Sequence, residues 1–409
     1  MNHFKKQQIQ NIADFNPIEQ LAKGALAKSV PMAMLKEFQR QITGYEIKAF
    51  NSGAKFRNGD TLLAKITPCL ENGKTAFVDI LDDEEVAFGS TEFIVLRAKN
   101  ETNPEFLYYF AISPDFRKRA IECMEGTSGR QRVNENVLKT LELPIPEPQT
   151  QQSIAAVLSV LDKKIALNKQ INARLEQMAK TLYDYWFVQF DFPDANGKPY
   201  KSSGGDMVFD ETLKREIPKG WEVKSLWKVA KYFNGLALQK YRPENEFDDF
   251  LPVIKIREMN EGVSLNTERA KTNIPKEAII DDGDILFSWS ATLEIKIWSQ
   301  GKGALNQHIF KVTSSEYPKY FFYFELLNYL KHFKMIADLR KTTMGHITQD
   351  HLKQAYICIP SQLLLEKMER IVTPIFQKML ITQKQNHQLT QLRDFLLPML
   401  MNGQVSVAE

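Results

Sequence analysis

Two stretches of the sequence carry side chains that could act in phosphate chemistry. Pro193-Asp194, followed by Glu222-Val223-Lys224, supplies the carboxylates and the lysine with which metal-dependent nucleases hold Mg²⁺ and cleave a phosphodiester. Gly73-Lys74-Thr75 resembles the end of a phosphate-binding loop, but Pro68 stands where that loop needs its first glycine. Because the first nuclease-like pair lies in a loop and the second opens a new globular unit, we expect no nuclease site. We expect Gly73-Lys74-Thr75 to begin a strand.

Other catalytic and cofactor-binding patterns are missing from the sequence. No glycine-rich nucleotide fingerprint follows a strand, and there is no Asn-Pro-Pro-aromatic tetrapeptide of the kind that holds a flipped adenine in amino-methyltransferases. The histidines have no repeating metal-ligand spacing, and the cysteines form neither a CxxC pair nor an even disulfide framework: His308, His332, His346, His351, Cys69, Cys123 and Cys358. We therefore expect no catalytic residue, no metal and no cofactor in this chain.

The remaining polar signals suit recognition rather than catalysis. Arg130-Gln131-Arg132 follows a small, flexible Gly/Ser-rich stretch, and Arg and Gln can make paired hydrogen bonds to guanine and adenine edges. The alternative is a solvated basic loop. Ser288-Trp289-Ser290-Ala291-Thr292 follows an expected strand, and its hydroxyls could meet a backbone or a base; the alternative is an ordinary strand with one core tryptophan.

Length and composition bound the protein class. A chain of 409 residues is too long for one core and suggests two or three domains. An apolar fraction of 43% and a charged fraction of 25% are ordinary for a globular protein, and a net charge of +3 permits a nucleic-acid partner without demanding one. No apolar run approaches transmembrane length, and the N-terminus lacks a signal-peptide pattern, so we expect a cytoplasmic protein.

Two long helices must position these loops. Gln149 to Phe187 has no internal Gly or Pro and carries apolar residues at coiled-coil spacing. Its seam is Ile154, Leu158, Leu161, Ile165, Asn168, Asn172, Leu175, Ala179 and Leu182. Ser361 to Leu400 repeats the seam about 214 positions further on, at Met368, Val372, Ile375, Met379, Thr382, Asn386, Leu389, Arg393 and Leu396. A polar Asn in an apolar seam fixes register, so we expect Asn172 and Asn386 to meet in an antiparallel pair.

Each long helix follows a globular unit, and the two units repeat one order of elements. In the first we expect strands at Thr61–Ile66, Thr75–Leu81 and Glu92–Ala98, and a helix from Pro104 to Met124 broken at Pro114. In the second unit, Asp282-Gly283-Asp284 corresponds to Asn58-Gly59-Asp60 of the first. The segment Trp221–Leu226, which begins the second unit, corresponds to Phe4–Ile9. The helices match far better than the units do. The repeat therefore indicates a retained scaffold that carries diverged units, packed about a pseudo-two-fold axis with one unit at each end.

This order of elements resembles the specificity subunits of type I restriction–modification systems. The resemblance covers essentially the whole chain and includes the two Gly-Asp turns, Pro144-Ile145-Pro146 and Cys358-Ile359-Pro360 before each helix, and Ile217-Pro218-Lys219-Gly220-Trp221. It implies an α+β fold with two globular α/β target recognition domains in tandem pseudo-two-fold repeat, separated by two long antiparallel coiled-coil helices. The implied domains are 1–148 (recognition), 149–187 (central helix), 188–218 (linker), 219–360 (recognition), 361–402 (C-terminal helix) and 403–409 (tail).

The resemblance also implies a function. Each recognition domain would read one half of a bipartite sequence in double-stranded DNA, and the helices would set the spacer and dock two methylation subunits. Those subunits would bring S-adenosylmethionine, motor-nuclease subunits would complete the complex, and this chain would be non-catalytic. The candidate DNA contacts are Lys65, Thr67, Lys74, Ser128, Arg130, Gln131, Arg132, Lys255, Arg257, Ser288, Ser290, Thr292, Lys341, Thr342, Thr343 and His346. The alternatives are a self-contained DNA-modifying or DNA-cleaving enzyme and a non-DNA coiled-coil scaffold.

Overall fold

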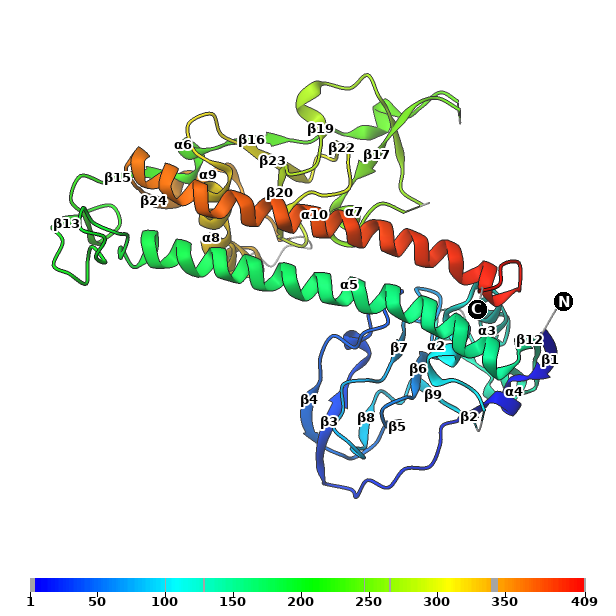
Figure 1. The fold of residues 1–409 in the computed structure, drawn as a ribbon. Helices are drawn as coiled ribbons and strands as arrows, with labels where there is room; N and C mark the ends of the chain where they lie inside the picture. Colours follow the sequence, from blue (N-terminus) through cyan, green and yellow to red (C-terminus); the bar gives the residue numbers. More distant parts are fainter. Residues whose placement is uncertain are drawn as a thin grey trace. The chain divides into compact units, whose positions relative to one another are not determined.

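The computed structural model describes residues 4–99, 101–127, 129–245, 247–264, 266–339 and 345–407 (Figure 1). The chain divides into two compact units. The first comprises Met1–Ala166 and Gln388–Glu409, and the second comprises Leu167–His387. Each unit therefore contains a globular part and a portion of each of the two long helices, α5 (Pro148–Tyr183) and α10 (Gln362–Met401).

The first unit is built on two four-stranded sheets. One is entirely antiparallel and has the order β2-β9-β6-β7; the other has the order β4-β3-β8-β5, with β3 and β8 parallel. A separate ribbon pairs β1 with β12. The strands are β1 (Phe4–Gln8), β2 (Ala13–Phe15), β3 (Leu26–Val30), β4 (Glu46–Ala49), β5 (Lys55–Phe56), β6 (Thr61–Ala64), β7 (Thr75–Phe77), β8 (Ala87–Gly89), β9 (Phe93–Ala98), β10 (Met124–Glu125), β11 (Arg132–Val133) and β12 (Glu142–Pro146). The helices are α1 (Ile9–Ile12), α2 (Pro104–Ile112), α3 (Pro114–Glu122) and α4 (Glu135–Thr140), with a 3-10 turn at Met32–Met34.

The second unit repeats the strand order of both four-stranded sheets and of the separate ribbon. Its sheets have the orders β16-β23-β20-β21 and β18-β17-β22-β19, again with one parallel pair, and its ribbon pairs β15 with β24. The strands are β15 (Glu222–Ser225), β16 (Lys231–Asn234), β17 (Phe250–Ile254), β18 (Arg269–Lys271), β19 (Ile279–Ile280), β20 (Ile285–Ser288), β21 (Ile295–Ile297), β22 (Gly303–Leu305), β23 (Ile309–Thr313) and β24 (Tyr356–Ile359). The helices are α6 (Leu226–Val229), α7 (Ile256–Glu261), α8 (Lys319–Leu339) and α9 (Gln349–Gln354). A hairpin of β13 (Met207–Asp210) and β14 (Arg215–Pro218) precedes them.

The Gly-Asp turns show that the repeat reaches individual side chains. Gly59 and Gly283 adopt φ of 88° and 85°, a left-handed conformation that favours glycine. The carboxylate of Asp60 accepts the backbone N–H three residues earlier at 2.9 Å, and that of Asp284 does the same at 2.8 Å. Each aspartate also pairs with a cation from the neighbouring strand. The match predicted between these two turns is therefore confirmed.

Local capping explains where the first unit's helix breaks. The side chains of Asn103 and Ser113 accept hydrogen bonds from the N–H groups of Phe106 and Phe116, and each cap is followed by a proline at the first helical position. The expected helix from Pro104 to Met124 is therefore two helices, α2 and α3, and the break lies at Pro114 as predicted. The predicted start at Phe4 is also confirmed, because β1 pairs with β12 in the way that β15 pairs with β24.

The seam of the long helices has the predicted direction but a different register. Every predicted seam position is buried or half-buried. Asn168 Nδ2 donates to Asn386 Oδ1 at 2.9 Å, and Thr382 Oγ1 donates to Asn172 Oδ1 at 2.5 Å, so the helices run antiparallel. Asn386 thus meets Asn168, and the prediction that it meets Asn172 is wrong.

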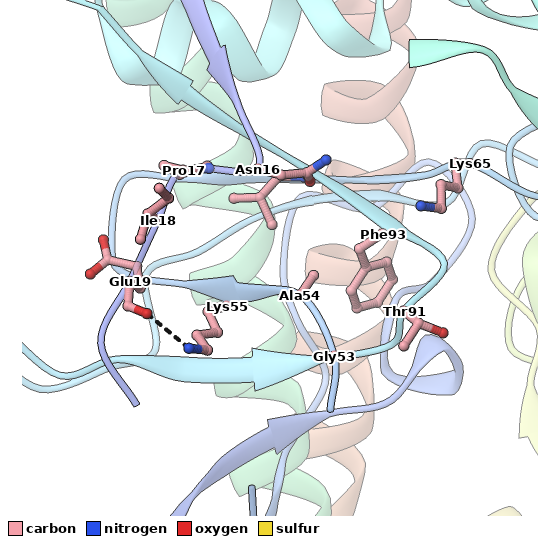
Figure 2. Close-up of a pocket in the computed structure, with 11 residues that line it drawn as sticks. Asn16, Pro17, Ile18, Glu19, Gly53, Ala54, Lys55, Lys65, Thr91 and Phe93 are labelled. Atoms are coloured by element: carbon pink, nitrogen blue, oxygen red, sulfur yellow. Dashed lines mark hydrogen bonds between the residues drawn. The ribbon is translucent and has the colours of Figure 1, made fainter. Parts of the chain in front are cut away.

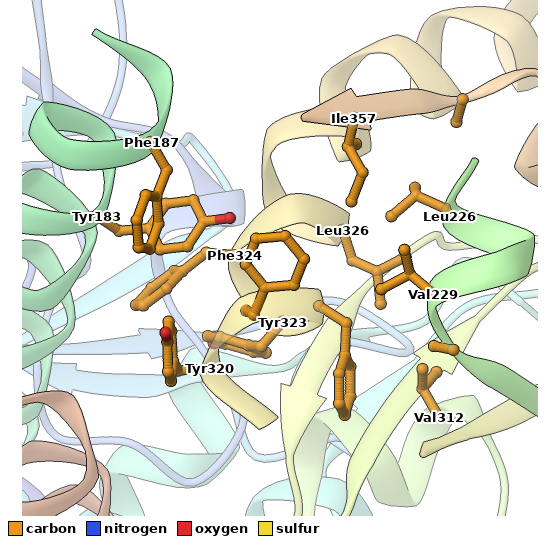
Figure 3. Packing of buried hydrophobic residues seen from close by; sticks show 14 of the residues in the cluster. Tyr183, Phe187, Leu226, Val229, Val312, Tyr320, Tyr323, Phe324, Leu326 and Ile357 are labelled. Atoms are coloured by element: carbon orange, nitrogen blue, oxygen red, sulfur yellow. The ribbon is translucent and has the colours of Figure 1, made fainter. Parts of the chain in front are cut away.

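Aromatic side chains fill the core of the second unit (Figure 3). The predicted core run at the start of α8, Tyr320 to Phe324, is buried. Tyr183, near the end of α5, packs against Phe324 with ring centroids 5.0 Å apart and donates its hydroxyl to Glu325 at 2.5 Å. The segment between α5 and β15 joins this core through Phe192, whose ring stacks between Tyr200 and Trp221. Long-range aromatic packing therefore binds the end of α5, α8 and this connecting segment together.

Candidate nucleic-acid interface

In the first unit, three segments far apart in sequence meet at the end of β6. The N–H of Lys65 donates to the carbonyl of Glu92 at 2.9 Å, and the N–H of Thr67 donates to the carbonyl of Gln131 at 3.0 Å. Ile66 and Arg132 form an isolated antiparallel bridge, and Val133 donates back to the carbonyl of Lys65 at 2.9 Å. We call residues 65–67, Glu92 and 131–132 the first cradle. It brings together four candidate residues from the sequence: Lys65, Thr67, Gln131 and Arg132.

The side chains of the first cradle form a charged network. Arg132 donates from Nε to Glu92 Oε2 at 2.9 Å and from Nη2 to Glu92 Oε1 at 2.7 Å. Hydrogen bonding to Arg132 lowers the pKa of the Glu92 carboxyl below its usual value. Lys65 Nζ lies 3.3 Å from Glu135 Oε1, and Glu135 also accepts from the Asn16 amide. The cradle thus presents arginine and lysine side chains that carboxylates hold in fixed directions.

The second unit builds the same backbone arrangement at the end of β20. Trp289 N–H donates to the carbonyl of His308 at 3.3 Å, and Ala291 N–H donates to the carbonyl of Gly345 at 3.0 Å. Ser290 and His346 form an isolated antiparallel β-bridge, and Ile347 N–H donates to the carbonyl of Trp289 at 3.0 Å. We call residues 289–291, His308 and 345–346 the second cradle. Each of its four backbone contacts has a counterpart in the first cradle, which aligns Trp289 with Lys65, His308 with Glu92 and His346 with Arg132.

The side chains of the second cradle are polar and aromatic. Ser290 Oγ lies 3.2 Å from His308 Nδ1, and Trp289 Nε1 donates to Asn234 Oδ1 at 2.9 Å. The amide of Gln307 lies 3.4 Å from the other ring nitrogen of His308. Three contacts of this cradle were missed among the candidates from the sequence, because long-range pairing brings them to Trp289 and Ser290: Asn234, Gln307 and His308. Trp289 itself was considered only as a core residue. Glu92 directly precedes β9, and His308 directly precedes the equivalent strand β23. Extending the sequence alignment of the two units from the Gly-Asp turns to these strands would have identified His308.

The other candidate residues lie in different settings. Ser288 is fully buried, and its hydroxyl donates to the carbonyl of Thr292 at 2.6 Å and accepts from the N–H of Glu294 at 2.8 Å, which holds a turn. Thr292 and Arg130 are exposed on turns. Lys74 Nζ lies 3.4 Å from the carbonyl of Met32. Around the start of α7, Lys255 pairs with Glu268 and Arg257 pairs with Glu258. The remaining candidates lie outside the described residues: Ser128, Lys341, Thr342 and Thr343.

An open hollow of about 370 Å³ lies beside the first cradle (Figure 2). Lys65 belongs to both, and Thr91 and Phe93, which flank Glu92, line the hollow. On its far wall, Lys55 Nζ donates to the backbone carbonyl of Glu19 at 2.9 Å. The hollow therefore places one further lysine near the cradle.

Across the described ranges, no group of three His, Cys, Asp or Glu side chains could hold a metal ion. In the nuclease-like pattern, Asp194 Oδ1 accepts the backbone N–H groups of Asn196 and Lys198 and so closes a turn. Lys224 instead contacts Glu222 and the hydroxyl of Tyr317. Among the described helices, none is long and apolar enough to cross a membrane.

Comparisons with known proteins agree with this architecture. Residues 24–177 and 218–391 match the family model of the type I restriction modification DNA specificity domain. The chain is 29% identical over 317 residues to the type I restriction enzyme MjaIX specificity subunit of Methanocaldococcus jannaschii, covering 75% of this chain and 70% of that protein. It is 28% identical over 408 residues to the HindI specificity subunit of Haemophilus influenzae, covering 85% and 87%.

A solved structure confirms the fold class. The crystal structure of the type I restriction-modification system S subunit from M. genitalium is similar with a TM-score of 0.53 at 17% identity, covering 97% of this chain and 96% of that chain. The predicted α+β class, with two α/β domains and two long helices packed together, is confirmed. The family model matches two specificity domains, and two relatives are similar over most of their length. This chain therefore belongs to the family of type I restriction-modification specificity subunits, which are the non-catalytic subunits of those enzymes.

Proposed function

We propose that each globular unit reads one half of a bipartite sequence in double-stranded DNA, with recognition domains at 1–148 and 219–360. The observation that carries this proposal is the pair of cradles. Equivalent backbone contacts hold three segments together in each unit, while the side chains at aligned positions differ: Lys65, Glu92 and Arg132 against Trp289, His308 and His346. A shared frame with unrelated side chains is what two readers of different half-sites require.

The cradle side chains have the chemistry of base readout. Arginine can donate two hydrogen bonds to guanine, and Asn or Gln can bind adenine in the major groove. The first cradle carries Arg132 and Gln131, and Asn234 and Gln307 adjoin the second. Arg130 is exposed beside the first cradle and would suit a phosphate. The chain's net charge of +3 is small, so we infer that partner subunits supply much of the phosphate clamp.

We further propose that the long helices set the spacer and dock two methylation subunits, which carry S-adenosylmethionine. Apolar side chains left exposed on α5 recur on α10 about 214 positions further on. Leu167 and Ile381 are 49% and 52% exposed, and Met178 and Leu392 are 63% and 45% exposed. Equivalent apolar faces on two equivalent helices suit two copies of one partner helix. Motor-nuclease subunits would then join through the methylation subunits.

The test is to co-express the chain with its cognate methylation subunit and to map methylated adenines in the host genome. Two short specified blocks around a fixed gap are expected, because two readers are held apart by a fixed length of helix. A continuous motif would overturn the two-reader proposal. Methylation that needs only the partner would favour a scaffold role, and methylation or cleavage by the isolated chain would reveal a self-contained enzyme.

A further inference from the structure

We infer that Glu92 is a positioning residue that holds Arg132 for a guanine in the half-site of the first unit. This inference rests on the proposed function and goes beyond it, because it assigns a base and the residues that select it. Glu92 stands at the end of a loop and has no recognition signature in the sequence. Its role emerges from the geometry of its contact with Arg132.

The contact leaves one edge of the guanidinium available. Glu92 accepts from Nε and Nη2 of Arg132, at 2.9 and 2.7 Å, which uses the side edge of the planar group. An arginine can also donate from its end edge, through Nη1 and the second hydrogen of Nη2. That edge points away from the carboxylate, and the Arg132 side chain is 50% exposed. Two parallel donors at this spacing match O6 and N7 of guanine.

The backbone fixes both ends of the pair. Arg132 lies in β11, bridges Ile66 and is followed by Val133, which donates to the carbonyl of Lys65. The carbonyl of Glu92 accepts the N–H of the same Lys65. Arginine is a long and mobile side chain, and a pair held at both backbone ends and along one edge presents the guanidinium in one orientation. The direction of the guanine contact is therefore set before DNA arrives.

The charges around Glu92 explain how a carboxylate can lie on a surface proposed to face DNA. A lone glutamate would repel phosphates, and its presence weakens non-specific attraction. Arg132 and Lys65 both lower the pKa of the Glu92 carboxyl, so it stays ionised and its charge is balanced within the cradle. A carboxylate so placed orients the arginine rather than contacting the DNA backbone.

The second unit supplies the contrast. His308 and His346 occupy the positions aligned with Glu92 and Arg132, and His308 lies against Ser290. No arginine–carboxylate pair occupies the described part of this cradle. The guanine contact we infer therefore belongs to one half-site only, which gives an experiment an internal reference within the same DNA target.

The test uses the full chain in complex with its methylation subunit. Initial methylation rates are compared for the mapped target and for targets carrying a substituted base pair at each specified position. We expect Arg132→Ala to lower the preference for one G·C pair in one half-site by roughly 5- to 150-fold, the range for one bidentate base contact. Glu92→Ala should reduce preference at that same pair, and Glu92→Asp should retain part of it. Base preference in the other half-site should stay unchanged.

Matched controls separate positioning from folding. Arg119→Ala and Glu122→Ala remove an exposed arginine–glutamate pair of the same kind, 3.3 Å apart on α3 and outside the cradle, and should leave all preferences unchanged. The inference is overturned if Glu92→Ala leaves the base preference at every specified position unchanged. It is also overturned if Glu92→Ala lowers base preference equally in both half-sites. Either result would make the Glu92–Arg132 contact a surface ion pair only. A wild-type complex without a split motif would instead overturn the proposed function itself.

Discussion

Arg393 on α10 donates from Nη1 to Oδ1 of Asp162 on α5 at 2.8 Å, and both side chains are only 7% exposed. The other carboxylate oxygen of Asp162 accepts from the hydroxyl of Tyr109 on α2 at 2.8 Å. One buried carboxylate therefore joins the globular part of the first unit to both long helices. Arg393 occupies a seam position that the repeat aligns with Ala179, so this ion pair is specific to the first unit.

Removing one partner of this pair should be costly. Asp162→Ala removes the buried one of the two carboxylates that pair with Arg393 and leaves the exposed Asp394, which Arg393 contacts through Nε and Nη2. Breaking a buried ion pair costs up to about 3–5 kcal/mol of unfolding free energy. We expect a lower urea midpoint for the Asp162→Ala chain. The double variant Asp162→Ala with Arg393→Leu should recover part of the loss, because the buried seam then holds no guanidinium that lacks its buried partner. A double variant less stable than the single one would contradict this account.

Glu325 makes the stability of the second unit depend on pH. Burial raises the pKa of Glu325 to about 7, with opposing contributions from the Tyr183 hydrogen bond, Lys180 and Arg215. The folded state therefore keeps a proton that the unfolded chain releases near pH 4.5. The stabilising contribution is full below that pH and is lost as the pH rises through about 7, a change of about 3 kcal/mol.

Glu325→Gln tests this pH dependence. Glutamine is neutral at every pH and its carbonyl can still accept from the Tyr183 hydroxyl, so the variant should lose the decline between pH 5 and pH 8. The melting temperature of each protein across that range is the measurement. Glu366→Gln on the exposed face of α10 should behave as the wild type does. Parallel pH profiles for the wild type and Glu325→Gln would show that Glu325 is ionised in the folded chain.

The polar contacts in the seam should specify the pairing register more than they add stability. Asn386→Leu removes the acceptor of the Asn168 amide, which is buried, and an unsatisfied amide costs about 1–3 kcal/mol. The double variant Asn168→Leu with Asn386→Leu should be at least as stable as the wild type, because a matched apolar pair replaces the amides. Denaturant midpoints decide this. A stable single variant would mean that water satisfies Asn168.

The sequence predicted the seam because coiled-coil spacing is a local property that each helix carries by itself. It predicted the antiparallel direction because two equivalent helices were found in one chain. The partner of Asn386 could not be predicted in this way. A sequence repeat identifies equivalent residues, such as Asn172 and Asn386, whereas packing pairs non-equivalent ones, here Asn168 with Asn386.

The candidate site was predictable where turn chemistry marks a loop. The Gly/Ser-rich stretch before Arg130 predicted that Gln131 and Arg132 would lie at a surface, and both belong to the first cradle. Glu92 and His308 were not found, because long-range backbone hydrogen bonds to Lys65 and Trp289 bring them to the cradles. Ser288 had the expected position after a strand, but its hydroxyl is consumed by the turn that follows. Such use of a hydroxyl depends on a neighbouring backbone that a pattern of residue types does not specify.

The exposed apolar positions on α5 and α10 should control how many methylation subunits bind. Met178 and Leu392 are equivalent by the repeat and are both exposed. If each belongs to one of two docking faces, Met178→Glu or Leu392→Glu alone should reduce the complex from two methylation subunits to one, and the double variant should release both. A buried charge without a partner is costly enough to break such a contact. Particle mass in solution measures the stoichiometry, and Arg174→Glu, an exposed change on α5 that removes no apolar surface, is the control. Two bound subunits in every variant would move the docking surface away from these positions and leave the apolar side chains without an assigned partner.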